Sequence, residues 1–271
     1  MTSGFRALTA VRREDTDRFA LDIEQGSFIA RGPNGGYIAA VLLRALQVRL
    51  ADVDGEIGLR SPRSLTIHYP APPAVGPAVI TTEIIRAGRS LVTASAQLEQ
   101  NSLPMAVALA AFSPAWPGEY WTDETPPTAP PPAEVSDTGI DRPPLPFLDY
   151  WEHRFTRGRV VDADGPAETE GWIRLAEVEP IDAPVIAAMT DAFPPAVFMR
   201  SSAPSPVPTI DLTIHFRAGV PASGLDPELW VLGRFRTRTI VEGFLEENGE
   251  LWTADGALMA QSRQLAIMLP G

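Results

Sequence analysis

Cysteine and lysine are both missing from this chain of 271 residues, whose 22 basic residues are all arginine. The lack of cysteine excludes disulfides, thiolate metal ligands and cysteine nucleophiles. Positive charge is scarce as well, because the net charge is -12. Such a field repels polyanions, so the composition predicts a protein that binds neither nucleic acid nor anionic membrane surfaces.

Long apolar runs are also missing. The run "YIAAVLLRAL" ends well short of the roughly 20 residues that a membrane-spanning helix needs. The beginning of the chain, "MTSGFRALTAVRRED", lacks the apolar core of a secretory signal. We therefore expect a cytoplasmic protein with no membrane insertion.

Several motifs of catalysis are absent too. There is no G-x-S-x-G elbow, and "RGPNGGY" fits neither the Walker nor the dinucleotide-binding pattern. The three histidines, His68, His153 and His215, are not grouped with carboxylates at metal-ligand spacing. The sequence predicts no metal and no cofactor.

Proline is abundant, and it divides the chain. The stretch 113–146 is so rich in proline that it excludes a helix and disrupts a strand ladder. We predict an N-terminal domain at 1–115, a proline-rich linker at 116–148 and a C-terminal domain at 149–271.

The two halves repeat one plan. Apolar periodicity predicts a helix over 34–50, and Asp182 with Pro184 begins a second helix over 182–193. Strands are expected at 63–69, 78–86, 91–99 and 104–112, and again at 153–161, 170–175, 209–216, 229–241 and 258–269, with a hairpin over "ENG" joining 244–247 to 251–253. The core "LTIH" follows the helix in both halves. The sequence therefore predicts a tandem repeat of one α+β module.

The two copies differ in polar side chains. Aligning Leu65 with Leu212 places Asp211 where the first copy has Ser64. Aligning Met105 with Met259 places Gln264 where the first copy has Ala110, and the stretch "FRTRTIVEG" adds Thr237 and Thr239. An ionised aspartate that takes a proton from water, with hydroxyl and amide groups that orient it, suits hydrolysis. These residue types are equally common as turn, cap and surface residues.

Several stretches resemble the acyl-CoA thioesterase II family, also called TesB-like: "GPNGGYIAAVLLRAL", "RSLTIHYPAPPAVG", "IDLTIHF", "RTRTIVEGF" and "ELWTADGALMAQSRQLAIM". The resemblance covers nearly the whole chain. It implies a double hot-dog fold, in which each of two tandem repeats wraps an antiparallel sheet around a central helix. It also implies hydrolysis of acyl-CoA to a free fatty acid and CoA, without a cofactor, by a homodimer.

In that family an Asp, a Thr and a Gln of the second repeat activate a water molecule. Carried over by motif, these roles fall on Asp211, Thr237 and Gln264, with Thr239 as the other choice for the threonine. The glycines of "NGGY" (Gly35, Gly36) and the adjoining Tyr37 are candidate substrate-binding residues at a helix N-terminus. The same glycines equally suit a close approach of helix and sheet. The hairpin over "ENG" and the proline-rich linker have no counterpart in the family's best-known members.

Two other functions remain open at this stage. One is a non-catalytic protein that binds acyl groups or acyl-CoA. The other is an enoyl-CoA hydratase, which requires an Asp/His pair; Asp211 and His215 lie about 13 Å apart on an extended strand. Four arginines, at positions 60, 63, 86 and 89, are either ligands for the phosphates of CoA or solvated strand ends.

Overall fold

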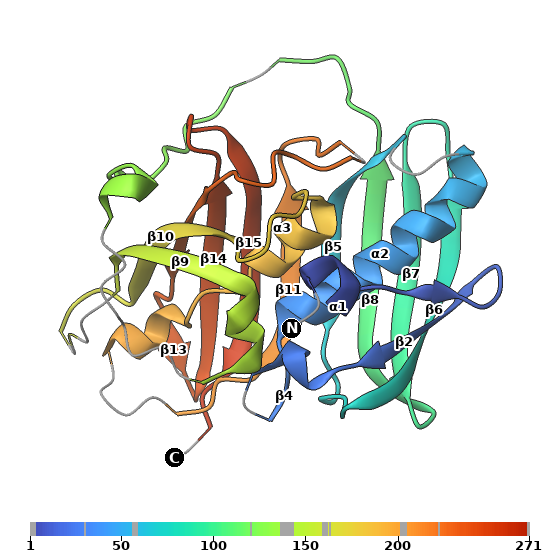
Figure 1. Ribbon diagram of the computed structural model, residues 1–271, viewed down its shortest axis with the longest axis horizontal. Helices are drawn as coiled ribbons and strands as arrows, with labels where there is room; N and C mark the ends of the chain where they lie inside the picture. Colours follow the sequence, from blue (N-terminus) through green and yellow to red (C-terminus); the bar gives the residue numbers. More distant parts are fainter. Residues whose placement is uncertain are drawn as a thin grey trace.

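The structure is a computed structural model of the chain, and it describes residues 4–29, 31–55, 59–119, 121–135, 144–158, 162, 164–200, 205–221 and 223–269. Within these residues one large antiparallel sheet curves around two helices, which lie on the same face of it (Figure 1). This is the predicted arrangement of two tandem repeats.

The first half holds one long helix and most of its strands follow that helix. Its elements are α1 (Phe5–Leu8), β1 (Arg12–Arg13), β2 (Arg18–Ile23), β3 (Phe28–Ile29), β4 (Gly32–Pro33), α2 (Gly35–Asp54), β5 (Ser61–His68), β6 (Gly76–Ala87), β7 (Val92–Gln100) and β8 (Leu103–Ser113). Helix α2 begins where the Asn34 side chain accepts a hydrogen bond from the Tyr37 amide. It ends at Gly55, whose φ of 85° is a left-handed conformation that favours glycine.

The second half repeats the order with a shorter helix. Its elements are β9 (Trp151–Arg157), β10 (Glu168–Leu175), α3 (Ala183–Met189), β11 (Thr209–Phe216), β12 (Val231–Arg236), β13 (Ile240–Val241), β14 (Phe244–Trp252) and β15 (Leu258–Ile267). Asp182 caps α3 by accepting a hydrogen bond from the Val185 amide, as Asn34 caps α2. Short 3-10 turns at Pro146–Tyr150 and Ala196–Arg200 precede β9 and follow α3.

Strand order reveals a local two-fold symmetry. The sheet runs β1-β2-β6-β7-β8-β5-β11-β15-β14-β12-β10-β9, so the two halves meet at β5 and β11 and mirror each other outward. Thr66 pairs directly with Thr213, its equivalent in the repeat, and their hydroxyls lie 3.1 Å apart. The symmetry axis therefore passes between these two threonines.

The core lies between the sheet and the two helices. Leu65 and Ile67 of β5, with Leu212 and Ile214 of β11, point inward and are fully buried. Helix α3 is buried at every position. An apolar helix without a solvent face has to be enclosed, which explains why both helices pack under the sheet and against each other.

Some sequence predictions about the elements are wrong, and the strands ahead of α2 were not predicted. The expected hairpin over "ENG" is absent, because β14 continues through Asn248 and Gly249, which pair with β12 on one side and β15 on the other. A Cβ at Gly249 would lie 2.5 Å from the Phe235 ring, so glycine here makes room inside a strand. The second helix stops at Met189 rather than at Phe193. Strand β2, ahead of α2, was not expected.

The segment between the halves crosses the outer face of the second half. Trp172 donates a hydrogen bond from its indole nitrogen to the Pro130 carbonyl at 2.9 Å. Ala129 and Val135 pack against the Trp172 cluster on that face. Strand β8 ends at Ser113 and β9 begins at Trp151, while the domain boundaries themselves stay a prediction.

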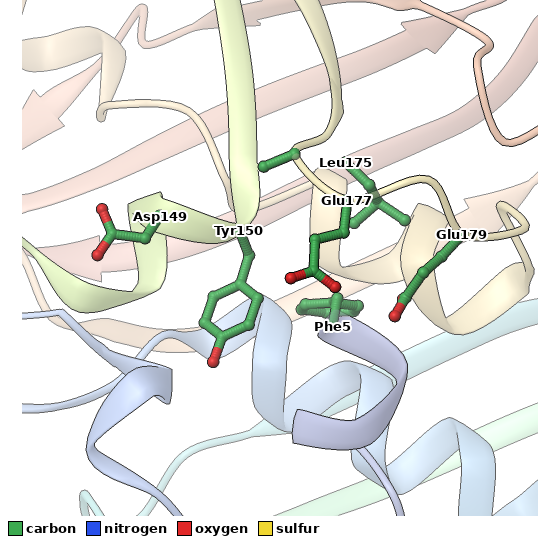
Figure 2. A pocket seen from close by; sticks show the side chains of 7 residues that line it. Phe5, Asp149, Tyr150, Leu175, Glu177 and Glu179 are labelled. Atoms are coloured by element: carbon green, nitrogen blue, oxygen red, sulfur yellow. The ribbon is translucent and has the colours of Figure 1, made fainter. Parts of the chain in front are cut away.

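The beginning of the chain packs against the second half. Phe5 of α1 contacts the rings of Phe147, Tyr150 and Trp151, with centroid separations of 6.4, 6.1 and 5.1 Å. Beside these rings lies a small hollow, and Phe5, Glu177 and Glu179 are among the residues that line it (Figure 2). Its volume of about 20 Å³ suits a single water molecule, so it does not serve as a substrate site.

Candidate active site

The structure does not bring Asp211 and Gln264 together. Gln264 lies on β15 with its side chain on the inner face and only 8% exposed. Asp211 of β11 sits directly opposite Leu265 and His68, which are both exposed. Directly opposed residues share a face of the sheet, and successive residues alternate, so Asp211 lies on the outer face. The prediction that Asp211 and Gln264 share one water molecule stays a prediction.

Thr237, the threonine predicted to act with Gln264, lies just after the end of β12. It is buried and donates its backbone amide to the Ala167 carbonyl at 3.0 Å. Within the described part of the chain its hydroxyl has no hydrogen-bond partner. Thr239 is exposed between β12 and β13. Neither threonine is hydrogen-bonded to Gln264 in the described residues.

A different threonine contacts Gln264. The Thr209 hydroxyl donates to Gln264 Oε1 at 2.9 Å. The register of β11 shifts between Thr209 and Asp211, so that Thr209 pairs with the buried Ala266 while Asp211 pairs with the exposed Leu265. This β-bulge turns Thr209 to the inner face and Asp211 to the outer one.

Glu247 of β14 is the second partner of Gln264. The amide Nε2 of Gln264 donates to Glu247 Oε1 at 2.9 Å, and the Ala196 backbone amide donates to Glu247 Oε2 at 2.6 Å. The side chain is almost wholly buried, and this burial is the main reason that the pKa of Glu247 rises to about 7. Near neutral pH this carboxyl is therefore part protonated.

The carboxylate closest to Gln264 on the helix side is Asp191. It follows α3 and is partly exposed, and its Oδ2 accepts a hydrogen bond from the Gly36 amide at 3.0 Å. Asn34 Nδ2 donates to the backbone carbonyl of Asp191 at 2.8 Å. Burial raises the pKa of Asp191 to about 6, against hydrogen bonds from Gly36, Gln264, Gly35 and Asn34, which lower it.

The N-terminus of α2 forms the opposite wall of this cluster. A Cβ at Gly35 would lie 2.9 Å from Asp191 Oδ2, and one at Gly36 would lie 2.6 Å from the Ala188 carbonyl oxygen. The two glycines thus admit the carboxylate and the end of α3, so the close approach is between two helices rather than between helix and sheet. The Tyr69 hydroxyl donates to the Gly35 carbonyl at 3.0 Å at the partly exposed edge of the site.

Tyr37 does not belong to this wall. Its side chain is fully buried, and after burial the groups that raise the pKa of its hydroxyl are Glu24, Tyr150 and Asp22. These lie along the N-terminal strand and the turn before β9. Tyr37 is therefore a core residue, and its backbone amide serves to bind the Asn34 cap.

The first half carries an apolar twin of the cluster. Leu65 pairs with Ala110 as Leu212 pairs with Gln264, and Ala94 pairs with Ala110 as Glu247 pairs with Gln264. The bulge that contains Thr209 recurs at Pro62. Counted from the two capping residues, Leu43 takes the place of Asp191. The polar set of the second half (Asp191, Thr209, Glu247 and Gln264) thus has the counterparts Leu43, Pro62, Ala94 and Ala110.

Sequence reasoning missed three of these residues. A signal for Asp191 was present, since counting from the two predicted helix starts sets it against an apolar Leu43. Thr209 was hidden by the bulge, and Glu247 by the hairpin wrongly assigned to its strand. In the described residues there is no group of three His, Asp or Glu side chains that could hold a metal.

Two family models match consecutive parts of this chain. Residues 24–113 match the model of the acyl-CoA thioesterase N-terminal domain, and residues 122–268 match that of the acyl-CoA thioesterase C-terminal domain. The chain belongs to the acyl-CoA thioesterase family. Membership of the acyl-CoA thioesterase family makes it a thioester hydrolase, and the predicted TesB-like resemblance is confirmed.

Relatives agree with the fold. A hot-dog protein of unknown function from Alicyclobacillus acidocaldarius is 28% identical, with a TM-score of 0.88 and full coverage of both chains. A thioesterase II from Thermobifida fusca, described as putative, is 28% identical, with a TM-score of 0.81 over 98% of this chain and 97% of that one. These matches confirm the predicted α+β double hot-dog fold.

A fungal relative extends the comparison. The thioesterase-like protein TwmA of Talaromyces wortmannii is 26% identical over 98% of this chain and 92% of its own length. Among the described residues, no helix is long and apolar enough to cross a membrane.

Proposed function

We propose that the chain hydrolyses acyl-CoA to a free fatty acid and CoA, with Asp191 as the general base. The observation that carries this proposal is the position of the Asp191 carboxylate, which accepts a hydrogen bond from the Gly36 amide at the N-terminus of α2 and lies beside the Gln264 side chain. A pKa of about 6 keeps the carboxylate mostly ionised at neutral pH and still basic enough to take a proton. Asp211, on the outer face of β11, is not part of the proposal.

The neighbours of Asp191 supply orientation. Thr209 holds Gln264 Oε1 and Glu247 accepts from Gln264 Nε2, so the amide plane is fixed from both sides. A fixed amide and hydroxyl beside the base can hold a water molecule at the distance that proton transfer requires. Gln264 and Thr209 are therefore assigned to water positioning, and Glu247 to positioning Gln264.

The chemical steps balance without a covalent enzyme intermediate. Asp191 removes a proton from water as its oxygen attacks the thioester carbonyl carbon, which leaves a negatively charged oxygen. The positive end of the twenty-residue helix α2 lies beside this charge and stabilises it. The carbon–sulfur bond then breaks, and the thiolate of CoA leaves with the proton that Asp191 took from water, which restores the Asp191 carboxylate.

No contact in the described residues supports the alternative function, enoyl-CoA hydratase. Asp211 lies opposite His68, yet in the described residues the two form no ion pair, and both belong to the outer face. A cytoplasmic homodimer remains our expectation from the family resemblance, and light scattering after gel filtration measures the second part of it.

The test is thiol release by the purified chain over a panel from acetyl-CoA to palmitoyl-CoA. We expect turnover of part of the panel, with kcat/KM of the best substrate rising as the pH increases through about 6 and levelling above it, because the ionised carboxylate is the active form. If no acyl-CoA releases its thiol although it binds, the chain is an acyl-binding protein and the proposal fails.

A further inference from the structure

A cleft lies on the other side of the local symmetry axis from Asp191. Its volume is about 260 Å³, and it opens between α1, α2, the start of β5, the N-terminus of α3 and the loop after β11. Its charged lining is Arg6, Arg44, Arg60 and Asp182, and its apolar lining includes Val48 and Val220. None of these residues belongs to the proposed active site.

The cleft lies where the repeat would place a second copy of the proposed active site. Its lining includes Asp182, the counterpart of Asn34, and Pro62, the counterpart of Thr209. Asn34 donates a hydrogen bond to the backbone carbonyl of Asp191 at the proposed active site. In the cleft, its counterpart Asp182 accepts a hydrogen bond from Arg44 Nη1 at 2.8 Å. Arg44 follows Leu43, the counterpart of Asp191, so the cleft has an arginine beside the position that carries the carboxylate in the other half.

The guanidinium groups of this cleft are incompletely paired. Arg44 donates its Nε to the Thr9 hydroxyl at 2.8 Å, but its buried Nη2 has no partner in the described residues. Arg60 lies 3.3 Å from Asp54 through Nε, and its buried Nη1 likewise lacks a partner there. The two side chains are only 13% and 12% exposed. The unpaired nitrogens themselves are buried, so a ligand in the cleft would contact the accessible remainder of these two side chains, which line it.

Charge adds to the argument. Three arginines line the cleft, and two of them are paired with carboxylates, Arg44 with Asp182 and Arg60 with Asp54, which leaves one excess positive charge in a chain of net charge -12. Guanidinium groups bind carboxylates and phosphates through paired hydrogen bonds. The apolar walls beside them, from Val48 and Val220, suit a non-polar group attached to the anion.

We propose that this cleft is a second, non-catalytic site for a small organic anion, whose carboxylate or phosphate contacts Arg44 and Arg60 while its apolar part lies on Val48 and Val220. The proposal does not depend on turnover at Asp191. It interprets the repeat as one module used twice, once with a carboxylate for chemistry and once with arginine for binding.

The experiment is calorimetric titration of the full chain with three probes: octanoate, adenosine 3′,5′-bisphosphate and inorganic phosphate. We expect octanoate or the nucleotide to saturate a single site per chain, and which of the two does so identifies a carboxylate or a phosphate ligand. Arg44→Gln and Arg60→Gln should each weaken binding by about tenfold or more, the effect of losing a charged hydrogen-bonding partner. Arg6→Gln, at an exposed side chain, provides a variant that leaves the core intact.

The matched control is Arg49→Gln. Arg49 lies on the same helix and pairs with Asp52 outside the cleft, so binding should match that of the wild type. Thermal unfolding of each variant establishes that it is folded. Three results would overturn the proposal: no probe saturates, the variants of Arg44, Arg60 and Arg6 all bind as the wild type does, or binding is lost in Gln264→Ala and kept in Arg44→Gln.

Discussion

The two halves of this molecule share one backbone plan and differ in what they bury. At matched places the second half carries Asp191, Thr209, Glu247 and Gln264, whereas the first half carries Leu43, Pro62, Ala94 and Ala110. Leu43, Ala94 and Ala110 are almost completely buried in the apolar core. The shared helix, sheet and bulge do not by themselves specify these polar side chains, on which the proposed active site depends.

The polar half keeps its cluster by internal hydrogen bonding. Thr209 donates to Gln264, Gln264 donates to Glu247, and Glu247 also accepts from the Ala196 amide. A buried polar network is tolerated when its members satisfy one another, and it is costly when one member is removed. The first half has apolar side chains at the matched positions, and their burial contributes to the stability of the fold.

The largest expected effect comes from exchanging the glutamine between the halves. Gln264→Ala should lower kcat by about 10²–10³-fold, because the amide that orients water is lost. The reciprocal change, Ala110→Gln, should leave kcat unchanged and lower the free energy of unfolding by about 1–3 kcal/mol, since it buries an unpaired amide. Thiol-release kinetics and urea unfolding measure both. Comparable activity in Gln264→Ala and wild type would contradict the asymmetry.

A smaller effect concerns pH and Glu247. Its pKa of about 7 exceeds the ordinary value of 4.5, so the folded state binds the proton more tightly than the unfolded state does. The free energy of unfolding should therefore fall as the pH rises from about 4.5 to above 7. In Glu247→Gln this fall should shrink by about 3 kcal/mol, as measured by urea unfolding across that range.

The matched control for Glu247→Gln is Glu83→Gln, which changes an exposed carboxyl of β6 in the first half. Its stability profile should follow the wild type. An unchanged slope in Glu247→Gln would mean that the buried carboxyl does not take up a proton on folding.

The smallest expected effect separates the two faces of β11. Thr209→Val removes the hydroxyl that holds Gln264 and should lower kcat about tenfold, the equivalent of one hydrogen bond. Thr213→Val, on the same strand but bonded to Thr66 at the symmetry axis, should leave kcat unchanged. Equal losses in the two variants would show that the strand, rather than the hydroxyl, matters.

Much of the fold could be predicted from the sequence, because its signals are local. The caps at Asn34 and Asp182 and the repeated "LTIH" strands fixed the tandem plan, and the alignment of Ala110 with Gln264 agrees with the observed registers. The site was predicted less well. The bulge beside Thr209 turns that side chain to the inner face, whereas simple alternation puts Asp211 and Thr213 on the outer face, and no residue pattern in β11 indicates the bulge. Glu247 became recognisable only once β14 proved continuous.

The most direct measurement of the account is kcat for Asp191→Asn beside Asp211→Asn, on the best acyl-CoA substrate and at a pH above about 7, where the base is ionised. We predict a loss of about 10²–10⁴-fold for Asp191→Asn, the usual contribution of a general base, and activity within about twofold of wild type for Asp211→Asn. A wild-type rate in Asp191→Asn, together with a collapse in Asp211→Asn, would contradict the account.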